Sequence, residues 1–199
     1  MEGTDILKNK SIISAHLDTE ILMSKAINKN REYIILNHEE VLNEENIKYF
    51  KKLVQERASK KPIAYILNKK FFWKNEFYVN KNTLIPRPDT EIIVEQILKV
   101  TKNKNNLRIL DIGVGSGCIL LSILKEKKNF YGTGIDISKN SLDISRINAK
   151  KLFVDERVKF FQSDVDKFGQ GKYDLIVSNP PYINHNRIKY LESDVSKFE

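Results

Sequence analysis

This 199-residue chain is poor in the features that mark secreted and membrane-spanning proteins. Its one cysteine, Cys118, cannot form an internal disulfide, and a single thiol suits a reducing cytoplasm. No apolar run approaches the roughly 18 residues that a membrane-spanning helix needs. Acidic Glu2 and Asp5 stand where a secretion signal has basic and then apolar residues. We therefore expect a cytoplasmic protein that has no contact with a membrane.

The chain also lacks the residue clusters that hold metal ions or triphosphates. His16, His38 and His185 are far apart in the sequence, so we expect ordinary surface or core roles for them and no metal site. No Lys-Ser or Lys-Thr pair follows the glycines of residues 113–117, which excludes a phosphate-binding P-loop there. Internal repeats and low-complexity linkers are absent from the sequence as well.

Acidic residues are outnumbered, with 26 Asp and Glu against 34 Lys and Arg and a formal net charge of +8. A charge of this sign favours a polyanionic partner such as RNA. The lysines are scattered along the chain, however, and form no compact basic block with interleaved aromatic residues. We therefore predict that the excess charge is spread over solvated faces and that direct contact with nucleic acid is not expected.

The hydrophobic pattern predicts helices across residues 1–70 and a β-hairpin across residues 71–86. Asn43 is the expected cap of a helix that ends before Pro62, with Arg57 near its end. The hairpin segment is rich in aromatic and β-branched residues, with turns expected at Lys74-Asn75 and Lys81-Asn82. The predicted apolar faces of the two main helices comprise Leu17, Ile21, Leu22 and Ala26, and Ile47, Phe50, Leu53 and Val54.

Residues 87–199 begin with a helix capped by Asp89 or Thr90, and strands then alternate with helices. The expected apolar face of this first helix comprises Ile92, Ile93, Ile97 and Leu98. Such an alternation predicts parallel βαβ units and therefore an α/β fold. The predicted strands begin near residues 108, 130, 158 and 173, and the helices between them near 118 and 139.

Glycines mark the turn from the first of these strands into its helix. Gly113, Gly115 and Gly117 permit positive φ and close approach of a ligand to the backbone and to a helix N-terminus. Cys118 replaces the third glycine of the dinucleotide fingerprint, so the spacing here is Gly-x-Gly-x-Gly. Asp136 ends the next strand 19 residues after Gly117, where a carboxylate can bind a ribose diol. This combination predicts a nucleoside-type cofactor.

The third and fourth strands also end in polar residues on the same edge of the sheet. Asp164 ends the third strand, where an adenine could lie, and Asn179 ends the fourth. Pro180 and Pro181 fix φ and remove backbone donors, so the chain after Asn179 can be neither helix nor interior strand. We interpret this stiff turn, which also displays Tyr182, as the place that holds the reacting group beside the cofactor.

Three segments together resemble the HemK/PrmC family: LIPRPDTEIIVE, ILDIGVGSGCI and VSNPPYI. The family comprises class I S-adenosylmethionine-dependent methyltransferases that modify the glutamine of the Gly-Gly-Gln motif in class 1 peptide chain release factors, the proteins of translation termination. The resemblance implies a helical domain over residues 1–70 that helps to hold the release factor. It further implies a β-hairpin linker over 71–86 and a Rossmann-like methyltransferase domain over 87–199.

The resemblance also implies roles for single residues. The glycines would cradle the methionine end of S-adenosylmethionine, Asp136 would hold the ribose, and Thr90 would touch the cofactor. Asn179 and the Pro180 carbonyl would accept hydrogen bonds from the substrate amide, and Tyr182 would pack on its plane. The implied catalytic residues are Asn179, Pro180, Pro181 and Tyr182, and the implied cofactor site comprises Thr90, Gly113, Val114, Gly115, Ser116, Gly117, Asp136, Asp164, Val165 and Asn179.

Two departures from the family pattern keep alternatives open. Val165 stands where members often carry an aromatic residue, and four strands are predicted where the class has seven. We therefore expect an incomplete catalytic domain that is inactive or weakly active alone, and a monomer when the domain is complete. One alternative is a nucleic acid adenine-N6 methyltransferase, which also presents an exocyclic NH₂ to Asn-Pro-Pro-Tyr. Another is a truncated, non-catalytic module that binds a release factor.

Overall fold

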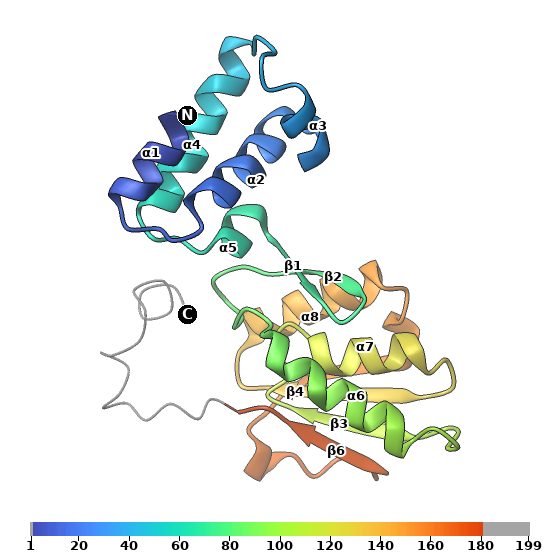
Figure 1. The fold of residues 1–199 in the computed structure, drawn as a ribbon. Coiled ribbons are helices and arrows are strands. Elements are labelled where there is room, and N and C mark those ends of the chain that lie inside the picture. Colours follow the sequence, from blue (N-terminus) through green and yellow to red (C-terminus); the bar gives the residue numbers. More distant parts are fainter. Residues whose placement is uncertain (1, 181–199) are drawn as a thin grey trace. The chain divides into compact units, whose positions relative to one another are not determined.

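The computed structural model describes residues 2–180 and divides them into two compact units, with the boundary between Leu67 and Asn68. The first unit is helical and the second contains a parallel sheet, as predicted (Figure 1). None of the helices in residues 2–180 is long and apolar enough to cross a membrane.

Five helices build the first unit, and their inward faces form one core. The buried apolar side chains include Leu7, Leu22, Leu53, Val54 and Ile66. Asn43 caps α4, because its side-chain oxygen accepts a hydrogen bond from the Asn46 amide at 2.8 Å, as predicted. The helices are α1 Glu2–Asn9, α2 Ala15–Ile27, α3 Arg31–Leu36, α4 Glu44–Ala58 and α5 Ile63–Leu67.

A buried ion pair joins α2 to α4. The Arg57 Nε donates to the Asp18 Oδ2 at 2.6 Å, and both side chains are about nine-tenths buried or more. Arg57 stands in the last turn of α4, as predicted, but its side chain lies in the interior. The predicted apolar face of α2 is wrong at Leu17, which is 42% exposed, because the helix turns Asp18 toward the core for this contact.

A β-hairpin opens the second unit. β1 (Lys69–Phe72) pairs antiparallel with β2 (Asn75–Tyr78), and Phe72 faces Asn75 across the turn. The turn is therefore Trp73-Lys74, and the predicted turn at Lys74-Asn75 is wrong by one residue. Trp73 adopts the left-handed conformation, with a φ of 55°. The rings of Phe72 and Phe77 meet edge to face in the core of this unit.

A short 3₁₀ turn, Pro88–Thr90, precedes helix α6 (Glu91–Val100). Thr90 occupies the N-cap position, but its side chain makes no capping hydrogen bond. The predicted apolar face is wrong in part, because Val94 and Ile97 are buried whereas Ile92 is 59% exposed. Ile97 belongs both to the predicted face and to the face that is buried. The packing of α6 against α7 buries the face that includes Val94.

Four parallel strands form the sheet in the order β5-β4-β3-β6. Helices α7 and α8 pack on one of its faces and enclose a core that includes Ile109, Leu120, Leu124 and Leu142. The chain leaves β3 toward β4 on one side and returns to β6 on the other, so the order reverses at β3. A ligand of an open α/β sheet binds at such a point, outside the carboxyl ends of the strands. The elements are β3 Arg108–Ile112, α7 Cys118–Glu126, β4 Tyr131–Asp136, α8 Lys139–Lys151, β5 Val158–Gln162 and β6 Leu175–Ser178, with short 3₁₀ turns at Asp155–Arg157 and Val165–Lys167.

The buried pair of the first unit leads to a prediction about stability. Asp18→Ala leaves the Arg57 guanidinium buried without this carboxylate, so we expect the free energy of unfolding of the first unit to fall by about 3–5 kcal/mol. Amide hydrogen exchange in α2 and α4 measures this quantity in the intact chain. Lys51→Ala is the control, because its ion pair with Glu2 is exposed and is worth about 0–1 kcal/mol. Similar losses in both variants would contradict the prediction.

Candidate functional site

A cavity of about 470 Å³ lies at the carboxyl edge of the sheet. The loop after β3, the ends of β4 and β5, the end of β6 and the segment before α6 all contribute to its lining. Nine of the residues that the sequence predicted as a cofactor site therefore share one cavity, namely Thr90, Gly113, Val114, Gly115, Ser116, Asp136, Asp164, Val165 and Asn179. Gly117 and Pro180 do not line it, and Pro181 and Tyr182 lie outside the described residues.

The register of the sheet explains why residues so distant in sequence meet here. Ile112 pairs with Ser178, so Gly113 and Asn179 leave the sheet next to each other. The Ser178 hydroxyl donates to the Ile112 carbonyl at 3.0 Å and strengthens this end of the pairing. The same edge receives Asp136, because parallel strands end together.

The three glycines of the loop serve different purposes. All have positive φ, which disfavours other residues. A Cβ on Gly113 would meet nothing within 4 Å, and on Gly115 its nearest neighbour would be a carbonyl oxygen at 3.9 Å. A Cβ on Gly117 would lie 2.7 Å from the Leu121 Cδ1. Packing therefore requires Gly117, whereas Gly113 and Gly115 leave open space beside the cavity.

Asp136 is held in place by backbone amides. The Gly115 amide donates to its Oδ2 at 3.0 Å, and the Ser138 amide donates to its Oδ1 at 2.9 Å. Each carboxylate oxygen keeps further acceptor capacity, because an ionised carboxylate has about four lone-pair sites. The side chain can therefore stay fixed while it accepts two hydrogen bonds from a diol.

Two buried polar residues of α8 hold the glycine loop from below, and the sequence analysis missed both. The Ser145 hydroxyl donates to the Gly115 carbonyl at 2.6 Å. The Asn148 Nδ2 donates to the Ser116 carbonyl and to the Tyr78 carbonyl, both at 2.9 Å. Both side chains are fully buried. The sequence does contain a sign of their burial. Ser145 and Asn148 follow Leu142 at helical spacing, on the face of α8 that the apolar residues occupy.

Asn179 and Thr90 are brought together from positions 89 residues apart. The Asn179 Nδ2 lies 3.4 Å from the Thr90 Oγ1, within reach of a long hydrogen bond. This contact uses the amide nitrogen of Asn179 and leaves its Oδ1 as an acceptor. The segment before α6 thus contributes to the orientation of the Asn179 side chain.

Burial raises the pKa of two groups at the base of the loop. Removal from water raises the pKa of Asp111 to about 7. The hydrogen bond from the Leu120 amide lowers this pKa, and the nearby charge of Asp136 raises it further. Burial likewise raises the pKa of the Cys118 thiol to about 12. Cys118 is therefore a neutral packing residue at physiological pH and no nucleophile.

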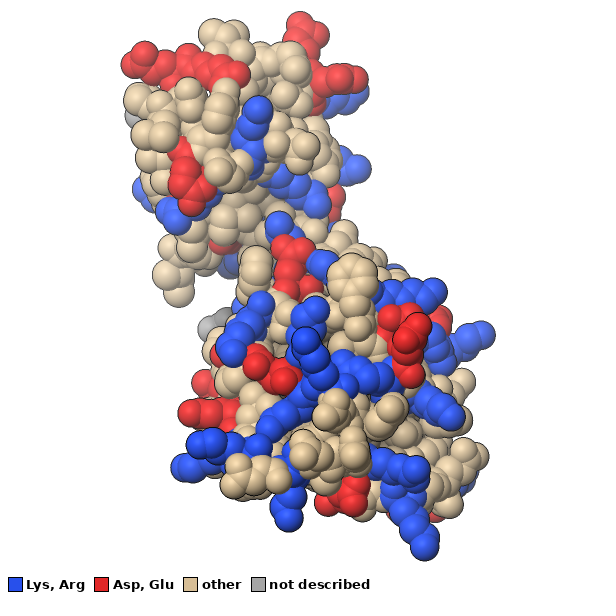
Figure 2. Space-filling model, turned by 90° about the vertical axis from the view of Figure 1, so that its right-hand side faces the viewer, with Lys and Arg blue, Asp and Glu red and all other residues tan. Residues whose placement is uncertain are grey.

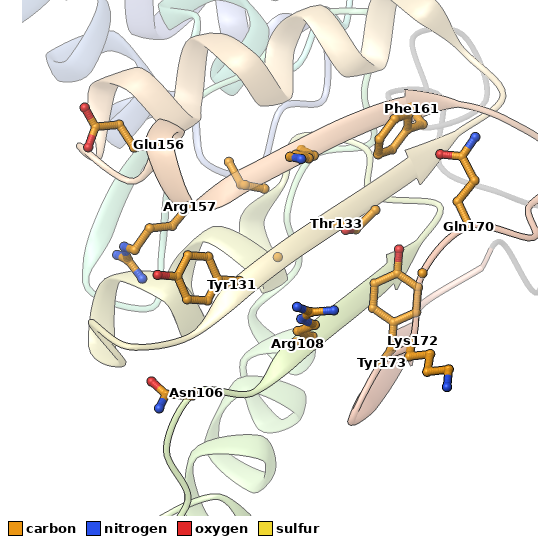
Figure 3. Close-up of a pocket in the computed structure, with 14 residues that line it drawn as sticks. Asn106, Arg108, Tyr131, Thr133, Glu156, Arg157, Phe161, Gln170, Lys172 and Tyr173 are labelled. Atoms are coloured by element: carbon orange, nitrogen blue, oxygen red, sulfur yellow. The ribbon is translucent and has the colours of Figure 1, made fainter.

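A larger hollow, of about 550 Å³, lies on the face of the sheet opposite α7, and it extends from the starts of β3 and β4 to Phe161 near the end of β5 (Figure 3). It contains none of the residues that the sequence predicted as a site. Its lining combines cations with aromatic rings, including Arg108, Lys159, Lys172, Tyr131 and Tyr173.

The buried carboxyl of Asp111 leads to a prediction about pH. Between about pH 4 and pH 7 the folded chain keeps a proton that the unfolded chain has released. The free energy of unfolding of the second unit should therefore decrease as pH rises through this window, by about 1.4 kcal/mol per pH unit. Denaturant unfolding at several pH values measures this slope. Asp111→Asn should remove it, whereas Asp143→Asn on the exposed surface of α8 should keep it. Equal slopes in the two variants would show that another group titrates.

Known protein families match both units. A model of the PrmC N-terminal domain matches residues 1–67, and a model of the methyltransferase small domain matches residues 88–193. A release factor glutamine methyltransferase of Buchnera aphidicola is 40% identical over 190 residues, which cover 96% of this chain and 68% of that protein. One from Leptospira interrogans is 38% identical and covers 100% of this chain and 71% of its own length.

A longer relative is the bifunctional methyltransferase of Rickettsia bellii, which is 36% identical over 225 residues. The match covers 100% of this chain but 40% of that protein, so the chain spans less than half the length of this relative. From the domain models and the identity to the two release factor enzymes, we conclude that the chain belongs to the release factor glutamine methyltransferase family.

Proposed function

We propose that the second unit binds S-adenosylmethionine and transfers its methyl group to the side-chain amide nitrogen of the Gly-Gly-Gln glutamine in a class 1 peptide chain release factor. The observation that carries this proposal is the single cavity shared by the glycine loop, Asp136 and Asn179. Membership of the family supports the choice of substrate. We further propose that the protein acts in the cytoplasm and that the complete enzyme is a monomer.

The cavity fits the cofactor at three places. The open space at Gly113 and Gly115 admits a ligand against the backbone, which a side chain would prevent. Asp136 is fixed and has free acceptor sites for a ribose diol. Asp164 and Val165 line the part of the cavity beside β5, where we place the adenine. When bound, S-adenosylmethionine supplies an electrophilic methyl group on a sulfonium.

Asn179 has the clearest role toward the substrate. An amide nitrogen is a poor nucleophile, because its lone pair is delocalised into the carbonyl group. The Asn179 Oδ1 and the Pro180 carbonyl would accept hydrogen bonds from the substrate NH₂ and favour a pyramidal nitrogen that is aimed at the methyl group. Holding the reacting atoms in line can supply up to about 7–11 kcal/mol in ideal systems. Tyr182, outside the described residues, would pack against the amide plane, with Pro181 stiffening the turn.

We propose the first unit as the docking surface for the release factor. Helix α3 has no buried residue, and Ile35, Leu36 and Val41 are 52%, 78% and 94% exposed. A cavity of about 390 Å³ beside them is lined by α2 and α3, including Met23 and Tyr33. Exposed apolar side chains next to a hollow are typical of protein-binding surfaces. In this proposal residues 1–70 dock the factor and residues 71–86 link them to the methyltransferase domain over 87–199.

A methyl-labelling experiment tests the proposed function. The chain is incubated in molar excess over a class 1 release factor with methyl-labelled S-adenosylmethionine, so that even the weak activity expected of this chain labels the factor. A factor with the motif glutamine replaced by alanine should stay unlabelled. Labelling of adenine-containing DNA or RNA instead would favour the adenine-N6 methyltransferase. Tight binding of the factor without any labelling would favour a non-catalytic binding module.

The different roles of the loop glycines lead to a matched pair of variants. Gly115→Ala costs about 1–2 kcal/mol of backbone strain, but its methyl group enters open space at the cavity. We therefore expect a small loss of stability and at least about a tenfold loss of cofactor affinity by calorimetry. Gly117→Ala has the same strain plus an overlap with Leu121, which adds about 1–3 kcal/mol to its loss of stability. Unchanged cofactor affinity in Gly115→Ala would place the ligand elsewhere.

Substitution at Asn179 should separate binding from transfer. Asn179→Ala should leave the cofactor dissociation constant within about threefold but lower the single-turnover rate by orders of magnitude, because its contact forms chiefly in the transition state. Thr90→Val removes only the hydroxyl that Asn179 contacts, so we expect about a tenfold lower rate, with recovery in Thr90→Ser. A loss of cofactor affinity as large as the loss of rate in Asn179→Ala would contradict its role toward the amide.

A further inference from the structure

The edge of the second unit opposite the cavity gathers basic residues from separate parts of the sequence. The connections α6–β3, α7–β4 and α8–β5 all end there, because the strands are parallel and each connection returns to a strand start. Figure 2 faces this side, and Lys and Arg side chains spread across the second unit in that view. We define the basic edge as Lys102, Lys104, Arg108, Lys125, Lys127, Lys128, Lys150, Lys151, Arg157, Lys159 and Lys172.

Hydrogen bonds hold these connections side by side. The Lys127 Nζ donates to the Thr101 and Lys102 carbonyls, both at 3.2 Å, and ties the second connection to the first. The Arg157 guanidinium donates to the Lys127 carbonyl at 3.1 Å and ties the third connection to the second. The Lys125 Nζ donates to the Leu152 carbonyl at 3.0 Å. These bonds hold the three connections of the basic edge next to one another.

Several cations of the basic edge remain available for a ligand. Lys102, Lys104, Lys128 and Lys150 are exposed, and among residues 2–180 no ion pair involves any of them. Lys151 differs, because it pairs with Glu76 at 2.7 Å. Five acidic residues lie in the same region, namely Glu76, Glu126, Asp155, Glu156 and Asp174, and two of them, Glu76 and Glu126, are already paired with lysines. The surface is therefore strongly positive.

Aromatic rings and amides stand among these cations. Phe153 is 85% exposed, and the Lys125 Nζ lies 5.7 Å from the centre of its ring. Tyr131 is 53% exposed and lines the hollow of Figure 3 together with Arg108 and Lys159. The exposed Asn103, Asn105, Asn106 and Asn129 alternate with the lysines.

This combination points to one class of ligand. We propose that the basic edge binds single-stranded RNA, an activity that goes beyond the proposed methyl transfer. Lysines neutralise phosphates, exposed rings stack on bases, and amides donate to and accept from 2′-hydroxyl groups. An anionic membrane would use the lysines but not the amides. The inference replaces the expectation that the excess charge is spread over solvated faces.

Two charge-matched variants of the full chain test the location. The edge variant carries Lys102→Glu, Lys128→Glu and Lys150→Glu. The control variant carries Lys81→Glu, Lys139→Glu and Lys167→Glu, three exposed lysines on segments at the cofactor edge of the same unit. Binding of a labelled 20-nucleotide RNA is followed by fluorescence anisotropy over a range of salt concentrations. Unchanged circular dichroism shows that both variants are folded.

We expect the edge variant to lose at least about tenfold in affinity for the RNA. The slope of the logarithm of the binding constant against the logarithm of the salt concentration should fall in magnitude by about two, because each single-strand phosphate contact contributes about 0.7 to it. The control variant should lose less than about threefold. Phe153→Ala should lower affinity about fivefold or more while the salt slope stays constant. Equal losses in the two charge variants would overturn the proposal. It would also fail if DNA of the same sequence, polyglutamate or phosphatidylserine vesicles bound as tightly as the RNA.

Discussion

The buried carboxamide of Asn148 is the contact on which the geometry of the second unit depends. Its Oδ1 accepts a hydrogen bond from the Tyr78 amide at 2.7 Å, and its Nδ2 donates to the carbonyls of Tyr78 and Ser116. One fully buried side chain thereby joins the hairpin, helix α8 and the glycine loop. Without it three backbone groups would lose a partner, and the loss at the buried Ser116 carbonyl alone would cost about 1–3 kcal/mol. The same residue therefore serves stability and the shape of the cavity.

The two sides of the cavity differ in how firmly they are held. Ser145, Asn148 and the backbone amides around Asp136 fix the side where we place the cofactor, so this side is pre-organised for a ligand. On the substrate side, β6 pairs with β3 alone within residues 2–180, and Asn179 makes one long contact with Thr90. In the proposed function this division gives the cofactor a pre-formed side of the cavity, while Asn179 on the less constrained side contacts the substrate amide.

The topology of the sheet determines where the positive charge of the protein is concentrated. In the sequence the lysines are scattered, which argued for spread, solvated charge. In the fold each connection from a helix to the next strand returns to the same edge, so lysines from residues 102 to 172 meet there. The cofactor cavity lies at the opposite edge, where the strands end. A parallel sheet thus separates two surfaces of different chemistry on one small unit, which permits both to be occupied at once.

Local pattern was sufficient to predict the order of helices and strands, the Asn43 cap and the polar residues at the strand ends. These features depend on neighbours in the chain and on the rule that parallel strands end at one edge. The sequence alone did not reveal the Asp18–Arg57 pair, the support from Asn148 or the exposed position of Ile92. The first two contacts join residues 39 and 70 positions apart, and the third depends on which face of α6 meets α7. Periodicity shows that a helix has an inward face, but only tertiary packing decides which polar side chains enter it, because a buried polar group is tolerated only where a distant partner satisfies it.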